Sequence, residues 1–526
     1  MSPDTARTPT DDRRWVGPVA RIAAASVVLR LLFHGLLFRF ELAGDEAHYW
    51  DWARNLQLSY HTKGPAVAWL IRLGTELLGH NEVGVRVFTW LSGAVATMAA
   101  GWLGAMLAPK EPRKVALLAA LLFQAVAAYQ VTASVMTIDM PMIAGWMVAS
   151  AATVDLHRRA NAGRPVTTPC VVIGASLAFA FLAKYTAVLA GLGLLLGLWF
   201  DRRTLANAHG LRRGALLGFL AFAIGPGCVL LWNAQHDWAT VRHLLGHLSM
   251  EADGSNTSTF TGYQPMWTIE YFGIVFTACG PFVAIAMWLG VRWARHQDNA
   301  AMVRLCLWGA LPVLVFYAFV SLRTRVEGNW AIGAYGPLVA PTALWLRRQQ
   351  LDGRWRWLRR AIAIRGIATM AVILFAIPML QGVARLGAAL GQDWDNALHR
   401  VVGHRRFADE IRTRVRAATG KNAEDLPILV NYYDRVGLLG FYLPGHPIVR
   451  CASRLLGGRP SAYDDFASTR LPDDTLLGRQ VVLVGADEAR WRGALELDDL
   501  QALGIVLQRG RKRQLFVARL KAFKTP

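Results

Sequence analysis

Disulfide and metal-ligand patterns are scarce in this sequence. Its 526 residues include five cysteines, which form neither a Cys-x-x-Cys pair nor a His-rich ligand spacing. Four of them lie in or beside apolar segments, where cysteine behaves as a small hydrophobic residue. Cys451 is alone in the C-terminal part, so a disulfide within that part is excluded. The sequence also lacks an HExxH zinc-protease motif, an internal repeat and a low-complexity tract.

Long polar stretches are rare in the first two thirds of the chain. Hydrophobic residues make up 54% of the sequence and tryptophans number 20, which is typical of a polytopic membrane protein. The formal charge of +21 would suit nucleic-acid binding, but the basic residues fall in short clusters between apolar runs. That pattern indicates membrane topology and argues against a DNA-binding face.

A membrane-spanning helix needs ~20 mainly apolar residues, and on that rule we expect about 11 spans, among them 267–291 and 361–383. The N-terminal segment lacks a small-residue cleavage site, so the first span is expected to stay uncleaved. The connectors that follow alternate spans are rich in Lys and Arg. The positive-inside rule therefore predicts a cytoplasmic N-terminus in the inner (plasma) membrane, with loops 39–82 and 233–266 facing outward.

Charged residues return from about Leu386 onward, and no later stretch could cross a membrane. Segments 426–433, 478–488 and 504–523 read as strands, the last as a hairpin around Gly510, and 402–419 reads as a helix. We therefore expect two domains. Residues 1–384 would form an all-α polytopic membrane domain, and residues 385–526 a smaller α/β domain that an odd number of spans places outside the cytoplasm.

The outward loop contains an unusual cluster of ionisable residues between Gly44 and Pro65. Adjacent Asp45 and Glu46 must point in different directions in regular structure, and a carboxylate can take a proton from an attacking hydroxyl or amine. The alternative is a helix N-terminal pair favoured by the helix dipole, and the two readings are compatible. Lys63 suits a lipid phosphate as a point charge, or it could snorkel toward water at a membrane surface. His48, His61, Tyr49 and other aromatics complete the cluster.

Further polar residues recur at the outward ends of later spans. Asp139 stands at the start of an apolar segment, where it could join Asp45 in holding a divalent metal or an acceptor amine, or simply cap a helix. Lys184 falls between two short apolar runs. The connector RTRVEGNW contributes Arg325, Glu327 and Asn329. Arginine suits bidentate contact with phosphate, although Arg325 and Glu327 could instead neutralise each other.

Four motifs in this order resemble membrane glycosyltransferases of the GT-C type, in the branch that includes protein O-mannosyltransferases and the lipid A aminoarabinose transferase. They are GDEAHYWDWARNL with HTKGP, MTIDMP, FLAKYTAVL and RVEGNW. The resemblance implies a GT-C fold and a sugar donor linked to polyprenyl phosphate. It also implies an acceptor in the cell envelope, which would be a lipid, a glycan or a protein. A flippase or transporter of lipid-linked sugars is the alternative.

The resemblance also implies roles for individual residues. Asp45 would be the catalytic base, Glu46 its helper, and Asp139 a second acidic residue near acceptor or metal. Candidate ligands for the donor phosphate and the rest of the substrate are Lys63, Lys184, Arg325, Tyr49, His61, Glu327 and Asn329. The aminoarabinose enzyme has an acid immediately before the lysine, whereas this chain has Thr62, which weakens the case for a metal at Asp45 and Asp139.

Overall fold

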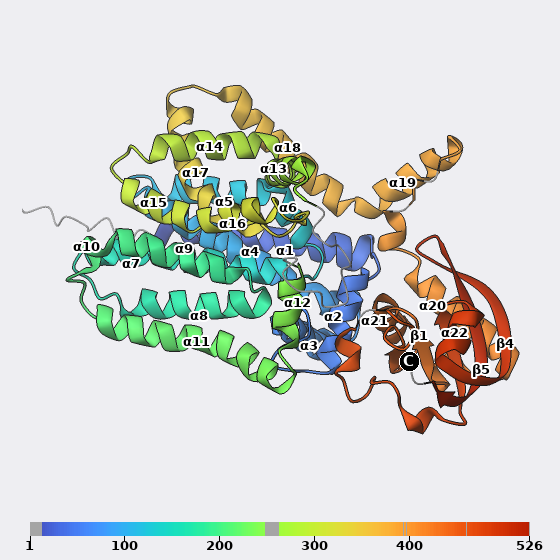
Figure 1. Cartoon of the computed structure of the whole chain (residues 1–526). Coiled ribbons are helices and arrows are strands. Elements are labelled where there is room, and N and C mark those ends of the chain that lie inside the picture. The colour runs from blue at the N-terminus through green and yellow to red at the C-terminus, as the bar shows by residue number, and fades with distance from the viewer. Residues whose placement is uncertain (1–12, 248–261, 393, 396, 459, 525–526) are drawn as a thin grey trace, which may run out of the picture.

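The computed structural model describes residues 13–247, 262–392, 394–395, 397–458 and 460–524. Helices lying side by side form one part of the molecule, and a smaller α/β part sits at one end of them (Figure 1). The expected combination of a helical membrane part and a smaller α/β domain is confirmed. Residues 248–261 of the predicted outward loop 233–266 lie outside the described residues.

The helical part runs from the N-terminal region to the start of the sheet domain. Its helices are η1 Arg13–Trp15, α1 Val16–Arg30, the π-helix η2 Leu31–Leu37, α2 Gly44–Arg54, α3 Ala66–Leu78, α4 Glu82–Leu107, α5 Pro112–Ala125, α6 Ala127–Thr132, α7 Asp139–Asn161, α8 Thr167–Ala183, α9 Ala187–Phe200, α10 Arg202–Leu205, α11 Leu211–Gln235, α12 Ala239–His247, α13 Pro265–Cys279, α14 Pro281–Ala294, α15 Ala300–Trp308, α16 Leu311–Val320, η3 Ile332–Ala334, α17 Tyr335–Leu351, α18 Arg356–Leu374 and α19 Ala376–Ala389.

Four spans in the described part of the chain are long and apolar enough to cross a membrane. They are Arg13–Leu37, Glu82–Leu107, Leu211–Gln235 and Ala300–Val320. The number rises to as many as six if each of two bent helix pairs counts as one span. The higher number expected from hydropathy therefore stays a prediction. Several predicted spans correspond to shorter helices, such as α8 and α9, because Lys184 to Thr186 interrupt the run.

Two predicted spans are sharply bent. Predicted span 267–291 is divided between α13 and α14, which meet at 93°. Gly280 lies at the break with φ 102°, a backbone conformation that glycine adopts without strain, and Pro281 then starts the next helix. Predicted span 361–383 falls on α18 and α19, which meet at 80°. Hydropathy reports only that such a stretch is apolar, so it cannot reveal a bend of this kind.

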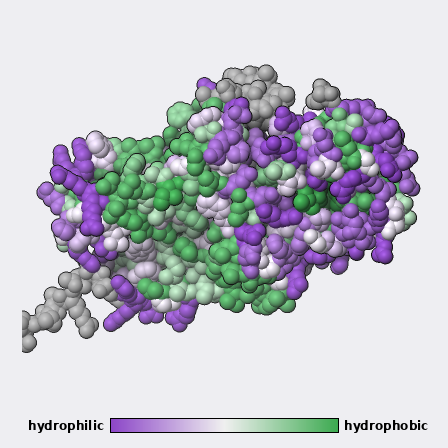
Figure 2. Space-filling view, turned by 90° about the horizontal axis from the view of Figure 1, so that it is seen from below, coloured by the Kyte–Doolittle hydropathy of each residue, from purple (hydrophilic) through white to green (hydrophobic). Residues whose placement is uncertain are grey.

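Large apolar side chains cover the outside of the helical part. Figure 2 shows a broad hydrophobic band over it, bordered by hydrophilic surface at the far end and over the α/β part. Side chains of the helical part that are exposed by more than half include Leu195, Phe219, Ile224, Trp288, Phe319 and Ile367. An apolar surface of this extent on a water-soluble protein would drive aggregation, and lipid contact accounts for it.

The α/β part is built on one mixed sheet. Its strands β1 Ile428–Val430, β2 Val449–Cys451, β3 Gln480–Gly485, β4 Leu495–Gln508 and β5 Arg511–Phe523 lie in the order β2-β1-β3-β5-β4. β1 pairs in parallel with β2 and β3, whereas β5 is antiparallel to both β3 and β4. The predicted hairpin around Gly510 is therefore present as β4 and β5. The predicted helix 402–419 is α20 His404–Thr419.

Two further helices of this part, α21 Tyr433–Tyr442 and α22 Glu488–Ala494, were not predicted from the sequence. Helix α21 packs directly on α2 of the outward loop. At Gly437 an added Cβ would lie 2.3 Å from the carbonyl oxygen of Ala47, so only glycine permits this approach. The backbone N–H of Leu42 also donates to the Tyr442 hydroxyl at 2.7 Å. The outward loop and the α/β part therefore share one packed core.

Candidate active site

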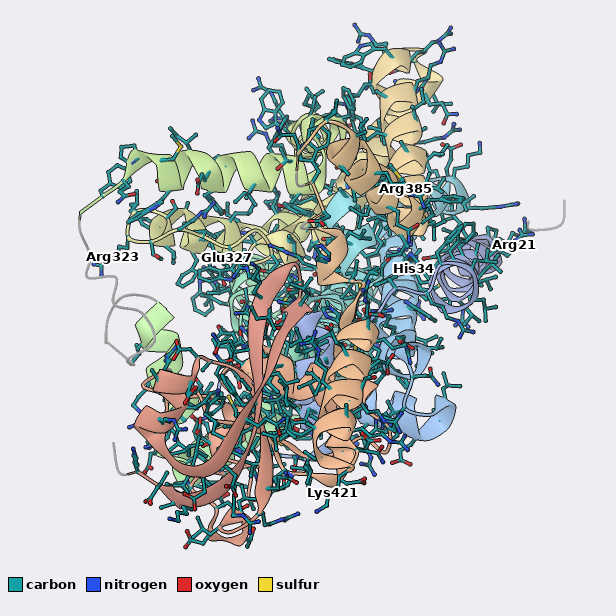
Figure 3. All side chains as sticks on the ribbon, turned by 90° about the vertical axis from the view of Figure 1, so that its right-hand side faces the viewer. Arg21, His34, Arg323, Glu327, Arg385 and Lys421 are labelled. Carbon is teal, nitrogen blue, oxygen red and sulfur yellow. The ribbon has the colours of Figure 1, made fainter. Side chains whose placement is uncertain are left out.

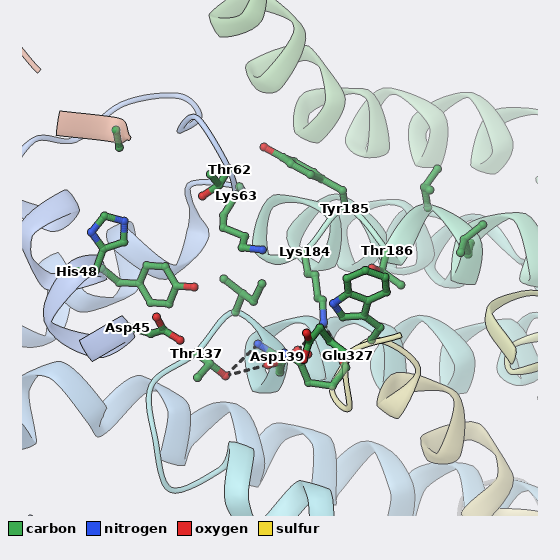
Figure 4. Close-up of a pocket in the computed structure, with 18 of the residues that line it drawn as sticks. Asp45, His48, Thr62, Lys63, Thr137, Asp139, Lys184, Tyr185, Thr186 and Glu327 are labelled. Atoms are coloured by element: carbon green, nitrogen blue, oxygen red, sulfur yellow. Dashed lines mark hydrogen bonds and ion pairs between the residues drawn. The ribbon is translucent and has the colours of Figure 1, made fainter. Parts of the chain in front are cut away.

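A cavity of about 620 Å³ opens where the ends of the helices meet the α/β part. Its walls come from the outward loop, the start of α7, the junction of α8 and α9, the end of α16 with the connector that follows, and two segments of the α/β part. Figure 4 shows labelled side chains from the outward loop, the start of α7, the α8–α9 junction and the connector after α16 around one space. The residues that line it include Asp45, His48, Tyr49, Lys63, Asp139, Lys184, Glu327, Asn329, Tyr433 and Ser461.

Asp45 lies in the first turn of α2 and faces the cavity. Burial raises the pKa of this carboxyl above its ordinary value, and the nearby cations Lys63 and Arg509 partly oppose that rise. Lys63 follows α2 in the same loop and also lines the cavity. Its neighbour Gly64 is pressed against α8, because an added Cβ would lie 2.0 Å from the carbonyl oxygen of Leu182. The cavity thus holds a base of raised basicity beside a cation.

Glu46 points away from the cavity into the protein. Its side chain is fully buried and binds Arg86 through two hydrogen bonds, in which Arg86 Nε donates to Oε1 at 2.7 Å and Nη2 donates to Oε2 at 2.5 Å. The backbone N–H of Ala43 donates to Oε2 at 3.0 Å and that of Met136 to Oε1 at 2.8 Å. The structure does not support the expected role of a catalytic helper, because all these contacts anchor the start of α2.

Asp139 and Lys184 form an ion pair in the wall of the cavity. Lys184 Nζ donates to Asp139 Oδ1 at 2.8 Å and to the carbonyl oxygen of Asn329 at 2.8 Å. The side-chain amide of Asn329 donates to Asp139 Oδ2 at 3.0 Å. Three motifs that are distant in the sequence therefore meet here. The spacing of single residues along the chain carries no signal for this pairing.

The structure brings most of the predicted substrate-binding residues together and leaves two outside. Tyr49, Glu327 and Asn329 line the cavity. His61 does not, and its Nδ1 lies 3.7 Å from Asp465 Oδ2 in the α/β part. Arg325 has a side chain that is 67% exposed, and its Nε donates to Glu270 Oε2 at 2.8 Å. The guanidinium of Arg325 therefore lies at the surface and outside the cavity lining, and its contact with phosphate stays a prediction.

A hydrogen-bond chain leads away from the cavity through His48. The Tyr463 hydroxyl lies 2.9 Å from His48 Nδ1 and also hydrogen-bonds the buried carboxylate of Asp51. Burial raises the pKa of Asp51 to about 6, and Arg54 opposes the rise. Tyr463 lies two residues after Ser461, so the α/β part both closes the cavity and fixes His48. Sequence reasoning missed Tyr463 because its partners are more than 400 residues away.

The residues present do not fit the divalent metal considered for Asp45 and Asp139. Both carboxylate oxygens of Asp139 already accept hydrogen bonds, one from Lys184 and the other from Asn329. A cation in the same wall also offsets the charge that would attract a metal. Among the residues that the structure describes, no group of three or more His, Cys, Asp or Glu could hold a metal ion.

Comparison with known proteins agrees with this geometry. Residues 62–226 match the family described as dolichyl-phosphate-mannose-protein mannosyltransferase. The chain is 28% identical over 453 residues to the lipid A galacturonosyltransferase RgtD of Rhizobium johnstonii, covering 82% of this chain and 83% of that one. It is 23% identical over 351 residues to the undecaprenyl phosphate-alpha-4-amino-4-deoxy-L-arabinose arabinosyl transferase of Pectobacterium carotovorum, covering 62% and 59% of the two chains.

Solved structures share the fold. ArnT from Cupriavidus metallidurans bound to undecaprenyl phosphate superposes with a TM-score of 0.62 at 17% identity, covering 95% of this chain and 98% of that one. The oligosaccharyltransferase AglB from Archaeoglobus fulgidus gives 0.51 at 12% identity, covering 89% and 69%.

These comparisons confirm the resemblance drawn from the motifs: the chain is a membrane glycosyltransferase, and its fold is similar to that of ArnT. Within that class it is similar over most of its length to a lipid A galacturonosyltransferase. The alternative of a flippase gains no support from these relatives, which are named as transferases.

Proposed function

We propose that this protein transfers a sugar from a polyprenyl-phosphate donor to a lipid A-like acceptor at the outer face of the inner membrane. The observation that carries the proposal is one cavity at the membrane-facing end of the α/β part that contains a carboxylate and a lysine side by side, Asp45 and Lys63. Relatives that use lipid-linked sugars or modify lipid A support the choice of donor and acceptor.

The chemistry needs one proton acceptor and one stabiliser of a leaving phosphate. Asp45 takes the proton of the acceptor hydroxyl as its oxygen attacks the anomeric carbon from the face opposite the phosphate. The new C–O bond forms while the anomeric C–O bond to phosphate breaks, so the configuration inverts. Lys63 lies against the phosphate oxygens, where the additional negative charge appears. The proton that leaves the acceptor balances the additional negative charge on the departing polyprenyl phosphate.

The remaining predicted residues shape the cavity in this proposal. The Asp139–Lys184 pair fixes the wall opposite α2, while Glu327 and Asn329 offer polar atoms to the sugar. Tyr49 presents an aromatic face on which a sugar can stack. Glu46 and Arg86 hold α2 so that Asp45 points into the cavity. His48, positioned by Tyr463, stands three residues from Asp45 on the same helix face and provides a route for the proton to leave.

We further propose the topology that the charge distribution favours. The basic connector around α10 lies at the end of the helical part opposite the α/β part (Figure 1). A cytoplasmic N-terminus then places the cavity and the α/β domain in the periplasm. We retain about 11 spans in residues 1–384 and a separate domain in 385–526, with the shorter helices completing spans between the longer ones.

The test of this function is sugar transfer by purified protein in detergent. Wild type and Asp45→Asn would be supplied with labelled polyprenyl-phosphate sugars and an envelope lipid extract. We expect labelled lipid with wild type and a loss of about 100-fold or more with Asp45→Asn, the range for removing a general base. Glu76→Gln is the matched control, because Glu76 is an exposed carboxylate on α3 of the same outward loop. Equal transfer by wild type and Asp45→Asn would rule Asp45 out as the base.

A further inference from the structure

Helices α2 and α21 lie side by side with their N-terminal ends together. Gly437, in the first half of α21, contacts Ala47 in the first half of α2, and Gly440 further along faces Arg54. Arg509 contacts both Gly44, the first residue of α2, and Asp434, the second residue of α21, so the two N-terminal ends lie near one another although the helices come from opposite ends of the sequence. Each has at least ten residues, so two sets of N–H groups and two positive dipole ends meet at one place, beside Asp45.

The tip of the β4–β5 hairpin reaches the same place. An added Cβ on Gly44, the first residue of α2, would lie 2.2 Å from Arg509 Nη2, so the guanidinium rests against the start of that helix. Figure 3 shows the hairpin rising beside α20 toward the helical part. Arg509 Nη1 also donates to Asp434 Oδ2 at 3.4 Å, near the start of α21. The hairpin thus adds a cation where the two N-termini already favour negative charge.

Arginines outnumber carboxylates around this point. Asp434 is approached by Arg509 and by Arg435, whose Nη1 lies 3.6 Å from its Oδ1. Asp434 and Arg509 both act electrostatically on Arg513. Burial lowers the pKa of Arg435 to about 10 and that of Arg513 below its ordinary value. Arg435 is only 3% exposed, and its Nη1 donates to Asn431 Oδ1 at 2.9 Å. One carboxylate, Asp434, is thus shared between Arg435 and Arg509, and buried cations are costly unless anions accompany them.

Most of the unsatisfied buried polar atoms at the cluster are hydrogen-bond donors, and the acceptors among them are Asp434 Oδ1 and Gln508 Oε1. Gln508 is 2% exposed, and neither its amide nitrogen nor its oxygen has a hydrogen-bond partner among the described residues. The same holds for the Nε atoms of Arg435, Arg509 and Arg513. The register pairs Gln508 with Arg511 and Val506 with Arg513, so Gln508 and Arg513 face the same side of the sheet. Buried donors of this number normally have partners.

We propose that Arg435, Arg509 and Arg513, with Gln508 and the N-termini of α2 and α21, bind an oxyanion of the substrate, a carboxylate or a phosphate group. The proposal rests on the glycosyltransferase function and assigns a role to the α/β domain within it. Tyr433, next to Asp434, lines the cavity, so the oxyanion would lie beside the reacting groups. This site is separate from Lys63 and the donor phosphate, and guanidinium forks suit both oxyanions.

The two possible sources of the oxyanion are the acceptor and the transferred sugar. Transfer rates would be measured for wild type, Arg509→Gln and Arg513→Gln with a phosphorylated acceptor glycolipid and the same lipid after phosphatase treatment. Each acceptor would be combined with a uronic acid donor and with a neutral hexose donor. We expect a rise of about tenfold in KM for the charged substrate alone, the size of one lost charged contact. The substrate that shows this rise is the one that carries the bound oxyanion.

A direct binding measurement separates this proposal from the proposed function. Glucose 6-phosphate and glucuronate would be titrated into the full-length enzyme in detergent, with methyl glucoside as the neutral probe. We expect the charged probes to bind wild type, to bind Arg509→Gln about tenfold more weakly, and to bind Lys512→Gln as well as wild type, because Lys512 is an exposed cation of the same hairpin.

Two results would overturn the oxyanion site while leaving the transferase function standing. One is equal binding of charged and neutral probes to wild type. The other is an identical loss of transfer with charged and neutral substrates in Arg509→Gln, which would mean that Arg509 acts only through Asp45. A wild-type enzyme that binds the charged probes but transfers no sugar would instead count against the proposed function.

Discussion

Lys184 and Asp139 join three segments at one point, since Lys184 Nζ donates to Asp139 Oδ1 and to the carbonyl of Asn329, both at 2.8 Å. The side chains of Lys184 and Asp139 are 9% and 3% exposed. Because both charges are buried, each needs the other, and removing one would leave the second uncompensated. The start of α7, the α8–α9 junction and the connector before η3 are therefore held in a fixed relation around the cavity.

Replacing Lys184 alone is expected to damage folding more than replacing the whole pair. Lys184→Met leaves a buried carboxylate without its cation and should cost about 3–5 kcal/mol. The double variant Lys184→Met with Asp139→Leu removes both charges and should recover most of that loss. Thermal unfolding of the three proteins in detergent measures the difference. A double variant no more stable than Lys184→Met would show that the pair is not the source of the loss.

Glu46 and Arg86 allow a test that separates structural from catalytic roles on neighbouring residues. Glu46→Gln should lower the unfolding temperature sharply, because Arg86 is 1% exposed and would keep a buried charge. Asp45→Asn should leave the unfolding temperature within a few degrees of wild type while abolishing transfer. Transfer by Glu46→Gln, measured per folded molecule well below its unfolding temperature, should stay within about tenfold of wild type. A deeper loss in fully folded protein would return Glu46 to the reaction.

The contact between α2 and α21 predicts a sharp effect of one methyl group. In Gly437→Ala the new Cβ would lie 2.3 Å from the carbonyl oxygen of Ala47, so the helices must separate. We expect a loss of about 1–3 kcal/mol in stability from such overpacking, together with weaker transfer because Tyr433 and Asp45 move apart. Gly493→Ala is the control, since Gly493 lies in α22 with nothing within 4 Å of an added Cβ. Limited proteolysis and melting curves would report the difference.

Most of the candidate residues in the four motifs line one cavity, but the motifs did not predict which contacts these residues make. Residues that lie close to Asp45 in sequence, such as Lys63, enter the same cavity, and the later motifs bring Asp139, Lys184 and Asn329 to it. The direction in which each side chain points was harder to predict. Alternation told us that Asp45 and Glu46 point apart but not which of them faces the cavity, because that depends on Arg86, 40 residues away.

The contribution of the α/β part could not be predicted from the sequence. Tyr463 and Arg509 contact α2 from more than 400 residues away in the sequence, and no local pattern reports such a contact. Arg325, by contrast, lies outside the cavity lining. Its residue type suits phosphate, but the side chain turns to Glu270 at the surface. The number of membrane spans also depends on helix bends at positions such as Gly280, which hydropathy does not detect.

Asp51 makes stability depend on pH. Its folded-state pKa is about 6 because of burial, above the ordinary value of 3.8. The folded protein therefore binds the proton more tightly than the unfolded chain, so this stabilisation is present below pH 4 and is lost as pH rises through 6. Two units correspond to about 3 kcal/mol. Relative to Asp51→Asn, wild type should lose melting temperature between pH 4.5 and 7.5. Parallel curves for the two proteins would contradict this assignment.

The pH dependence of catalysis should report Asp45. A general base acts only when it is deprotonated, so kcat/KM falls on the acidic side of its pKa. Burial raises that pKa, while Lys63 and Arg509 hold it down. The acidic limb should therefore lie above the value of about 4 typical of an exposed aspartate. Removing a nearby cation should then shift the acidic limb to still higher pH, because that cation no longer stabilises the deprotonated carboxylate.

Arg509→Gln is the variant that tests this, since Arg509 is outside the cavity lining and belongs to another domain. With a neutral acceptor and a neutral donor sugar, its acidic limb should shift to higher pH, whereas its rate on the alkaline plateau should remain close to that of wild type. Lys512→Gln, a change of the same charge on the same hairpin, should leave the limb in place. If both variants leave it unchanged, Arg509 does not act on the titrating group. A limb that persists unchanged in the residual activity of Asp45→Asn would assign the titration to another residue.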